Sequence, residues 1–442
     1  MENVKNLPKN KSKKNAVKFS KAYSAFFTFL CKIVNIFLRA KFYRTDAFNR
    51  QKKQGAMLLI SNHLSAYDFI YFCIAMKGAP LNFVVAENMM YSTPIFATLI
   101  KSYHAITKKQ FFADVQCIKS IKRYLDAGIT VLICPEGKVS ADGSTGTIPP
   151  SIAKLVQWLG YPVGYLKLQG ASIARPKWAH NLRKGKVQVD CDMLYDADTL
   201  KTLSRDEIAK GIQKALEHNE HAWQIENGIK FSGKHYAEEL QRLLYRCPKC
   251  HNEFCVTSAD DHVICTHCGN DVIYDHSGKL IPANENSVCP ERIDLWYNEQ
   301  RQDVANLVKE DGFRLSNKVN LFVENEKNNG YRFVAGGIMT MDKDVLRFDT
   351  DWDKRPCGVK SKFGVNSMEC YFEDGAETET VEEDLKHIEF SLKNYDTLAF
   401  MPGTSLDMYD AKHVYRFMFV DSIASTKYAL AVEELFKIRQ QA

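Results

Sequence analysis

The chain has 442 residues, of which 45% are hydrophobic and 25% charged, and its formal net charge is +6 at pH 7. This length predicts two to four domains, and the composition is typical of a soluble or peripheral globular protein and excludes a polytopic membrane protein. The 13 cysteines are an odd number in a long chain, which argues against a secreted disulfide framework and favours a reducing compartment.

The N-terminal region, residues 1–54, is strongly basic. Within residues 5–53, Asp46 is the only acidic residue among many lysines and arginines, a pattern that favours phosphate-bearing partners. The apolar stretch at 22–40, AYSAFFTFLCKIVNIFLRA, has no small-residue cleavage site, and its internal Lys32 is costly at the centre of a bilayer. We therefore expect an amphipathic helix that associates with anionic lipids on the cytoplasmic face of a membrane, with a core helix as the alternative.

Residues 55–200 alternate short apolar runs with helical stretches. The runs AMLLIS, NFVVAE, TVLICPEG and PVGYLKLQGA are typical of strands buried on both faces. The stretch VQCIKSIKRYLDAG has helical spacing and ends at Gly128, as a helix stop does. The alternation predicts an α/β domain with a mixed or parallel central sheet, whose ligand sites lie on loops after strand ends. His63 and Glu136 both follow such strands, so two distant motifs can meet in one cleft.

A short stretch, SNHLSAYDF at 61–69, pairs a histidine with an aspartate. The quartet SAYD at 65–68 fits a capping box, which explains Asp68 without any function and leaves His63 unexplained. Imidazole is a natural general base near neutral pH when a carboxylate fixes its tautomer. Five residues turn about 500° within one helix. The two side chains can therefore meet only if His63 lies on the turn before the helix and Asp68 in its first turn.

A helical connector is expected at 201–245, and a small zinc ribbon at 246–280. Two C-x-x-C pairs separated by 14 residues have the spacing of a tetrahedral thiolate site. The expected ligands are Cys247, Cys250, Cys265 and Cys268, with His251, His262 and His267 as nearby alternatives. Four cysteines leave no position for water, so a structural zinc is predicted, with iron as the alternative. Acidic residues in the knuckles and the lack of a basic or aromatic stripe argue against a nucleic-acid partner.

The last part of the chain, residues 310–442, contains several strand-like runs and ends in the amphipathic stretch TKYALAVEELFKIRQQ. A β-rich domain closed by one C-terminal helix is therefore predicted. This pattern resembles a PH- or GRAM-like domain, for which lipid binding and simple packing are the alternative roles.

Three motifs in order resemble those of the 1-acylglycerol-3-phosphate acyltransferase family. They are NHLSAYD at 62–68, CPEGKVS at 134–140 and GYPVGYLKLQG at 160–170. The resemblance implies a membrane-associated O-acyltransferase in which His63 is the general base and Asp68 orients it. It also implies acyl-CoA or acyl-ACP as the thioester donor and lysophosphatidic acid, a lysophospholipid, as the acceptor. No G-x-S-x-G motif occurs, so direct attack on the thioester is expected rather than a serine acyl-enzyme.

The resemblance places the acceptor-binding residues around this pair. They are Asn62, Lys108, Lys109, Glu136, Gly137, Lys138 and Arg175. The chain departs from the family where a threonine and an arginine are replaced by Lys138 and Val139, which removes a bidentate phosphate clamp but keeps a point charge. The basic cluster in ASIARPKWAHNLRKGKV is interpreted as a solvated face or as a further anion contact. Another lysolipid or a glycolipid therefore stays open as acceptor, and a non-catalytic lipid-binding scaffold is the rival outside the enzyme class.

Overall fold

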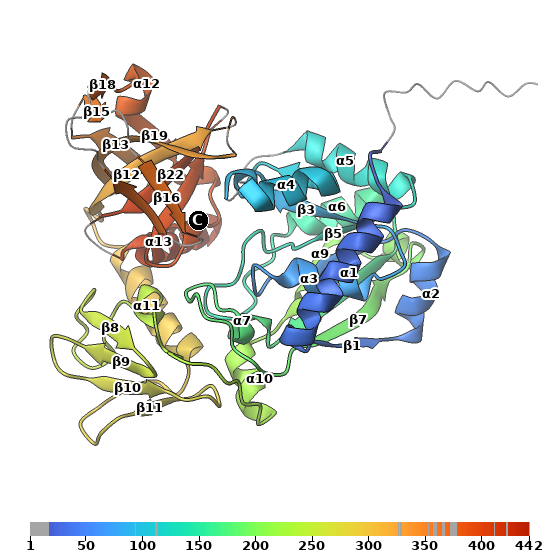
Figure 1. Ribbon diagram of the computed structural model, residues 1–442, viewed down its shortest axis with the longest axis horizontal. Helices are drawn as coiled ribbons and strands as arrows, with labels where there is room; N and C mark the ends of the chain where they lie inside the picture. The colour runs from blue at the N-terminus through green and yellow to red at the C-terminus, as the bar shows by residue number, and fades with distance from the viewer. Residues whose placement is uncertain are drawn as a thin grey trace, which may run out of the picture.

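The computed structural model describes residues 17–441, apart from gaps at 93, 111–113, 326, 328, 352, 357–359, 365–366, 372–377, 411 and 421–422. Figure 1 shows an α/β domain and a β-rich domain side by side, with a small cysteine-rich sheet next to both. Residues 1–16, which carry part of the predicted basic region, lie outside the described residues.

The α/β domain is built on seven strands, β1 (Lys41–Arg44), β2 (Leu58–Ser61), β3 (Leu81–Ala86), β4 (Ile106–Lys108), β5 (Thr130–Ile133), β6 (Val163–Gln169) and β7 (Gln188–Tyr195). Their order in the sheet is β1-β7-β6-β2-β5-β3-β4. The β6–β7 pair is antiparallel and every other neighbouring pair is parallel, which confirms a mixed central sheet. The carboxyl ends of β2, β5, β3 and β4 therefore share one edge of the sheet, where ligand sites are expected.

Helices cover both faces of this sheet. One face packs against α1 (Lys21–Leu38) and α3 (Asp68–Ala75), and the other against α5 (Val115–Asp126), α6 (Ser151–Leu159) and α9 (Arg205–Leu216). All residues of β2 and β5 are buried as a result, which explains their uninterrupted apolar sequences. The other helices and 3₁₀ turns here are α2 (Asp46–Gln54), η2 (Glu87–Tyr91), α4 (Pro94–Tyr103), α7 (Ala171–Ala174), α8 (Thr199–Thr202), α10 (Glu220–Glu226) and η3 (Leu240–Arg242).

Helix α9 extends the α/β core beyond residue 200. Its Ile208, Ile212 and Leu216 are fully buried in the same hydrophobic cluster as β2 and β5. This part of the expected connector is thus an integral layer of the α/β domain.

Helix α1 has one packed side and one exposed side. Cys31 and Leu38 are buried against the domain, whereas Ile36 and Phe37 are each 70% exposed. By length and composition α1 is also apolar enough to cross a membrane. The core contact and the free apolar face, considered as alternatives from the sequence, are both present in this helix.

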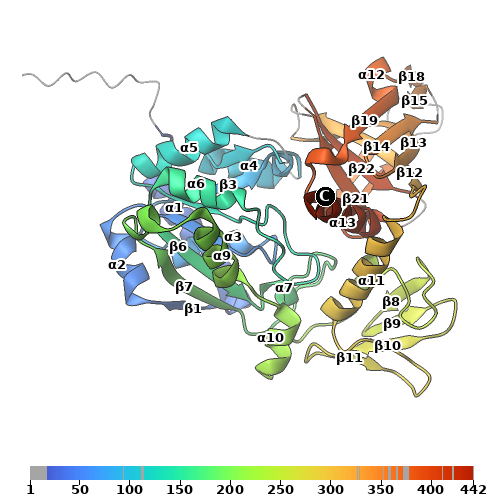
Figure 2. The same ribbon diagram turned by 180° about the vertical axis from the view of Figure 1, so that it is seen from behind.

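The cysteine-rich part is a four-stranded antiparallel sheet of β8 (Val256–Ala259), β9 (His262–Cys265), β10 (Asp271–Tyr274) and β11 (Leu280–Pro282). Helix α11 (Ile293–Leu307) then leads into the last domain. Both views show α11 between the cysteine-rich sheet and the β-rich domain (Figures 1 and 2).

The last domain is β-rich, as predicted. Its seven-stranded antiparallel sheet has the order β19-β14-β13-β12-β22-β21-β20. The strands are β12 (Leu315–Asn325), β13 (Gly330–Met341), β14 (Val345–Thr350), β19 (His387–Ser391), β20 (Ala399–Met401), β21 (Ser405–Tyr409) and β22 (Val414–Phe419).

The C-terminal helix α13 (Ser425–Gln441) packs against β20 and α11. Smaller elements are β15 (Lys354–Pro356), β16 (Lys360–Gly364), β17 (Ser367–Tyr371), β18 (Thr378–Thr380), α12 (Glu383–Lys386) and η4 (Leu392–Asn394). The PH- or GRAM-like identity stays a prediction.

Candidate active site and cysteine cluster

The turn that follows β2 holds His63 close to Asp68. The Nδ1 atom of His63 lies 2.9 Å from Oδ2 of Asp68. The same oxygen accepts hydrogen bonds from the backbone N–H groups of Leu64 (2.7 Å) and Ser65 (3.0 Å). Asp68 is buried, whereas the His63 side chain is 28% exposed. With Nδ1 donating to the carboxylate, Nε2 is the ring nitrogen that can accept a proton from a substrate hydroxyl.

The predicted capping box is only half formed. The carboxylate of Asp68 does accept from the Ser65 N–H, but the helix begins at Asp68 and has no side-chain cap. The hydroxyl of Ser65 donates to the carbonyl of Arg175 (3.2 Å) and accepts from the Tyr67 N–H (3.4 Å), while the Asp68 N–H donates to the Ser65 carbonyl (3.2 Å). The expectation of a complete box is therefore wrong, because Tyr67 occupies the N-cap position and Ser65 lies before it. The geometric requirement still holds, since His63 precedes the helix and Asp68 opens it.

Asn62 fixes the start of this turn. Its Nδ2 donates to the Leu168 carbonyl (2.9 Å), and its Oδ1 accepts from the Leu168 N–H (2.8 Å). Asn62 is fully buried, and these bonds extend the pairing of β2 with β6. Its contacts in the structure are with the backbone, and its predicted role in substrate binding stays a prediction.

Glu136 connects the second motif to the turn that carries His63. Its Oε1 accepts from the His63 N–H (3.2 Å) and its Oε2 from the Gly146 N–H (2.8 Å). Burial raises the pKa of Glu136 to about 7, although these two N–H groups and the charges of His63 and Lys138 act against burial. Four residues further on, the Ser140 N–H donates to the His63 carbonyl (2.8 Å). The backbone of His63 is thus held on both sides by residues 136–140.

Gly137 lies in the tight turn between Glu136 and Lys138. Its φ is +71°, in the left-handed region that glycine adopts at little cost, and its N–H donates to the Cys134 carbonyl (3.0 Å). A Cβ at this position would meet no atom within 4 Å, so the backbone is open to an approaching ligand. This agrees with the predicted role of the glycine without testing it.

Lys138 makes an unexpected contact. Its ammonium pairs with Oε1 of Glu433 on α13 and donates to Oγ1 of Thr397 (2.8 Å). Nearby, Nζ of Lys177 donates to the Val139 carbonyl (3.2 Å), and burial lowers its pKa to about 7, with the charge of Lys138 acting in the same direction. No local sequence pattern pointed to Glu433 or Thr397 as partners of Lys138. Lys177 was visible only as one member of a basic cluster.

The remaining predicted acceptor residues are Lys108, Lys109 and Arg175. Lys108 is exposed at the end of the edge strand β4, and the Lys109 N–H donates to Oδ2 of Asp114 (3.1 Å). The guanidinium of Arg175 bonds to the Ala179 carbonyl and lies 6.0 Å from the ring of Tyr67, which stands between His63 and Asp68 in the chain. Their predicted roles stay predictions.

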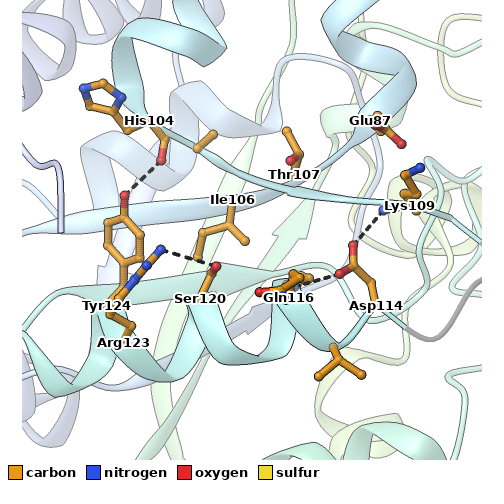
Figure 3. Close-up of a pocket in the computed structure, with 13 residues that line it drawn as sticks. Glu87, His104, Ile106, Thr107, Lys109, Asp114, Gln116, Ser120, Arg123 and Tyr124 are labelled. Atoms are coloured by element: carbon orange, nitrogen blue, oxygen red, sulfur yellow. Dashed lines mark hydrogen bonds between the residues drawn. The ribbon is translucent and has the colours of Figure 1, made fainter. Parts of the chain in front are cut away.

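A cavity of about 560 Å³ runs along β4 and α5. Figure 3 shows Lys109 and Asp114 at one end of it, and Arg123 and Tyr124 at the other. Its lining includes Lys109 but neither His63 nor Asp68. The cavity therefore lies along the edge strand β4 and does not include the turn that carries His63.

The cysteine-rich sheet brings the four predicted ligands together. The ligand atoms of Cys247, Cys250, Cys265 and Cys268 all lie within 4.8 Å of one another, and no histidine belongs to the group among the described residues. The Sγ atoms of Cys247 and Cys268 are 3.7 Å apart, as are those of Cys250 and Cys265. Tetrahedral zinc with Zn–S bonds of about 2.3 Å requires sulfur separations of about 3.8 Å. The donors therefore fit a zinc ion, and the group can bind a metal.

The comparisons with known proteins concern the α/β domain. Residues 41–164 match the family model described as Acyltransferase, and this segment contains His63, Asp68 and Glu136. A search of curated proteins found no match. Among solved structures, one similar chain is the 1-acyl-sn-glycerophosphate (LPA) acyltransferase PlsC from Thermotoga maritima, at 19% identity and a TM-score of 0.35, covering 44% of this chain and 84% of that chain. The family match shows that residues 41–164 are similar to acyltransferase domains.

We expect the protein to contain one zinc ion per chain when purified without chelator. Replacing Cys247 and Cys265 together by serine should remove the metal, because two of the four thiolates are lost. Cys255 is the matched control: its Sγ lies 3.5 Å from that of Cys265 but outside the ligand group. Metal analysis of the three proteins checks this. A wild-type protein without metal, or equal loss of metal in Cys255→Ser, would contradict the assignment.

The raised pKa of Glu136 predicts a pH dependence of stability. The unfolded chain has a glutamate pKa of about 4.3. The pKa in the folded protein is higher, so the protonated carboxyl of Glu136 stabilises the folded state. This contribution is complete below the unfolded pKa and is lost as the pH rises through the folded pKa of about 7. The unfolding free energy of wild type minus that of Glu136→Gln should fall by about 3 kcal/mol across this range. Denaturant unfolding at a series of pH values measures the difference, and parallel curves would refute the effect.

Proposed function

We propose that this protein is a membrane-associated O-acyltransferase that moves a fatty acyl group from acyl-CoA or acyl-ACP to the hydroxyl of lysophosphatidic acid, giving phosphatidic acid. The observation that carries the proposal is the His63–Asp68 pair, with 2.9 Å between Nδ1 and Oδ2, inside a segment that matches an acyltransferase family. Its partly exposed imidazole and buried carboxylate are what proton abstraction from a hydroxyl requires.

In the proposed reaction, Nε2 of His63 takes the proton of the acceptor hydroxyl while the oxygen attacks the thioester carbonyl. Asp68 stabilises the imidazolium that forms, because its buried carboxylate faces Nδ1. Collapse of the tetrahedral intermediate forms the new ester and breaks the C–S bond. The imidazolium then returns the proton to the leaving thiolate, so His63 ends the cycle neutral.

The exposed side of α1 supports the membrane part of the proposal. Phe26, Phe29, Ile36 and Phe37 expose between 57% and 70% of their surface, which is unusual for large apolar residues of one helix. Aromatic side chains of this kind insert at the headgroup level of a bilayer, next to basic residues that contact anionic lipids. Placement on the cytoplasmic face rests on the cysteine usage of the chain alone.

A second acceptor class is favoured by one observation. Lys138, which stands beside the position of the family's phosphate-binding arginine, is paired with Glu433. Two opposite charges in contact attract a phosphate monoester less than a free cation does. A lysolipid with a smaller head-group charge, or a glycolipid, is therefore the alternative acceptor.

A panel of acceptors tests both candidates. Wild-type protein and acyl-CoA are added to vesicles that contain lysophosphatidic acid, a zwitterionic lysolipid or a glycolipid as the acceptor. The lipid products are identified by mass spectrometry. We expect phosphatidic acid, with thiol release that His63→Ala lowers by at least about 100-fold because the base is lost. Product from another acceptor only would favour the alternative. Transfer by a folded His63→Ala at the wild-type rate would refute the mechanism, and no product from any acceptor would favour a non-catalytic scaffold.

A further inference from the structure

The last domain lies directly against the loop that carries the second motif. Figures 1 and 2 both place α13 on the side of the β-rich domain that faces the α/β domain. We define the motif loop as residues 137–139, between Glu136 and Ser140. Each of its three residues is connected to the last domain, directly or through one side chain.

The central contact is the ion pair of Lys138 with Glu433. Their side chains are 21% and 10% exposed, so water screens the pair only partly. Glu433 also receives a hydrogen bond from Thr397 (2.7 Å), and its Oε2 receives one from Arg301 (2.7 Å). Burial alone would raise the pKa of Glu433, but the charges of Lys138 and Arg301 hold it well below its usual range. The carboxylate is therefore ionised and fully occupied.

The two flanking residues are connected through side chains of the α/β domain. Nε2 of Gln110 donates to the Gly137 carbonyl (2.8 Å), and Oε1 of Gln110 accepts from the Tyr409 hydroxyl (2.8 Å). On the other side, Lys177 donates to the Val139 carbonyl and lies 4.2 Å from the ring of Phe400.

Tyr409 and Phe400 belong to β21 and β20, so all three contacts of the motif loop end in the same domain. The residues on either side of the loop, Glu136 and Ser140, bond to the backbone of His63. Glu136 accepts from the N–H of His63, and the Ser140 N–H donates to its carbonyl. A movement of the motif loop would therefore move the base relative to its substrate. Displacements of about 1 Å in a catalytic group cost rate without abolishing the fold.

We propose that the last domain is a working part of the active site, and that Glu433 is a positioning residue that holds the motif loop, and through it His63, by its ion pair with Lys138. The inference deepens the proposed function and rests on it for its kinetic consequence. It assigns this domain a role at the catalytic centre in place of an independent lipid-binding role.

The neighbouring glutamate supplies a matched control. Glu434 lies on the same helix, has the same 10% exposure, and also pairs with Arg301. Its other recorded partner is Lys437, and it does not contact Lys138. Glu433→Gln and Glu434→Gln thus remove the same charge from the same helix, but only the first removes the contact with the motif loop.

The experiment measures amide hydrogen exchange of peptides that cover residues 136–140, in the full chain, together with kcat and KM. We expect exchange in Glu433→Gln to be at least about tenfold faster than in wild type, because one of three contacts is lost. The kcat should fall by a similar factor with an acceptor KM within about threefold. Glu434→Gln should stay within about twofold of wild type, and Glu433→Asp, which keeps the charge, should recover most of the protection.

Two outcomes would overturn the inference. Equal exchange in the two glutamine variants would mean that Glu433 does not hold the loop. A lower acceptor KM in Glu433→Gln at unchanged kcat would mean that Glu433 competes with the acceptor for Lys138. If Glu433→Gln does not fold, Lys138→Gln breaks the same ion pair. Amide exchange of residues 136–140 in that variant then tests whether the pair holds the motif loop. The exchange result needs no acceptor, so it separates a failure of this inference from a failure of the proposed function.

Discussion

One oxygen of Asp68 organises the candidate site. Oδ2 faces Nδ1 of His63 and accepts from two successive backbone N–H groups, those of Leu64 and Ser65. Hydrogen bonds to an ionised carboxylate are stronger than neutral ones, and burial strengthens them further. A single buried carboxylate therefore fixes both the path of the turn after β2 and the orientation of the imidazole. The proposed chemistry depends on this interaction, because the imidazole of His63 would have no fixed orientation without it.

The rest of the structure holds this turn in place. Asn62, at the start of the turn, is hydrogen-bonded to β6. Glu136 and Ser140, which follow β5, are hydrogen-bonded to the backbone of His63. These ties come from three neighbouring strands whose carboxyl ends share an edge, which is where the topology of an α/β sheet gathers a site. The contacts of Gly137, Lys138 and Val139 extend the same network into the last domain. Residues far outside the matched segment 41–164 thus contact its second motif.

The sequence predicts those parts of the site whose geometry is local. His63 and Asp68 are five residues apart, so helix geometry alone limits how they meet, and the C-x-x-C spacing limits the cysteine group in the same way. Short apolar runs that alternate with helices predict the mixed sheet, because strands buried on both faces consist almost entirely of apolar residues. The contacts that the sequence does not predict involve distant partners. The hydroxyl of Ser65 bonds to Arg175, and Lys138 pairs with a glutamate 295 positions away. No local pattern encodes such contacts, and a single basic residue is equally compatible with a phosphate ligand and with an ion pair.

The most direct test of the central claim is the turnover of Asp68→Asn with acyl-CoA and lysophosphatidic acid, measured on protein shown to be folded. A neutral amide oxygen can still accept the hydrogen bonds that Oδ2 accepts, so the turn is kept, but it carries no negative charge to stabilise the imidazolium. We predict a fall in kcat of at least about 100-fold with the fold retained. Turnover within about twofold of wild type would show that Asp68 does not orient the base, and would contradict the account.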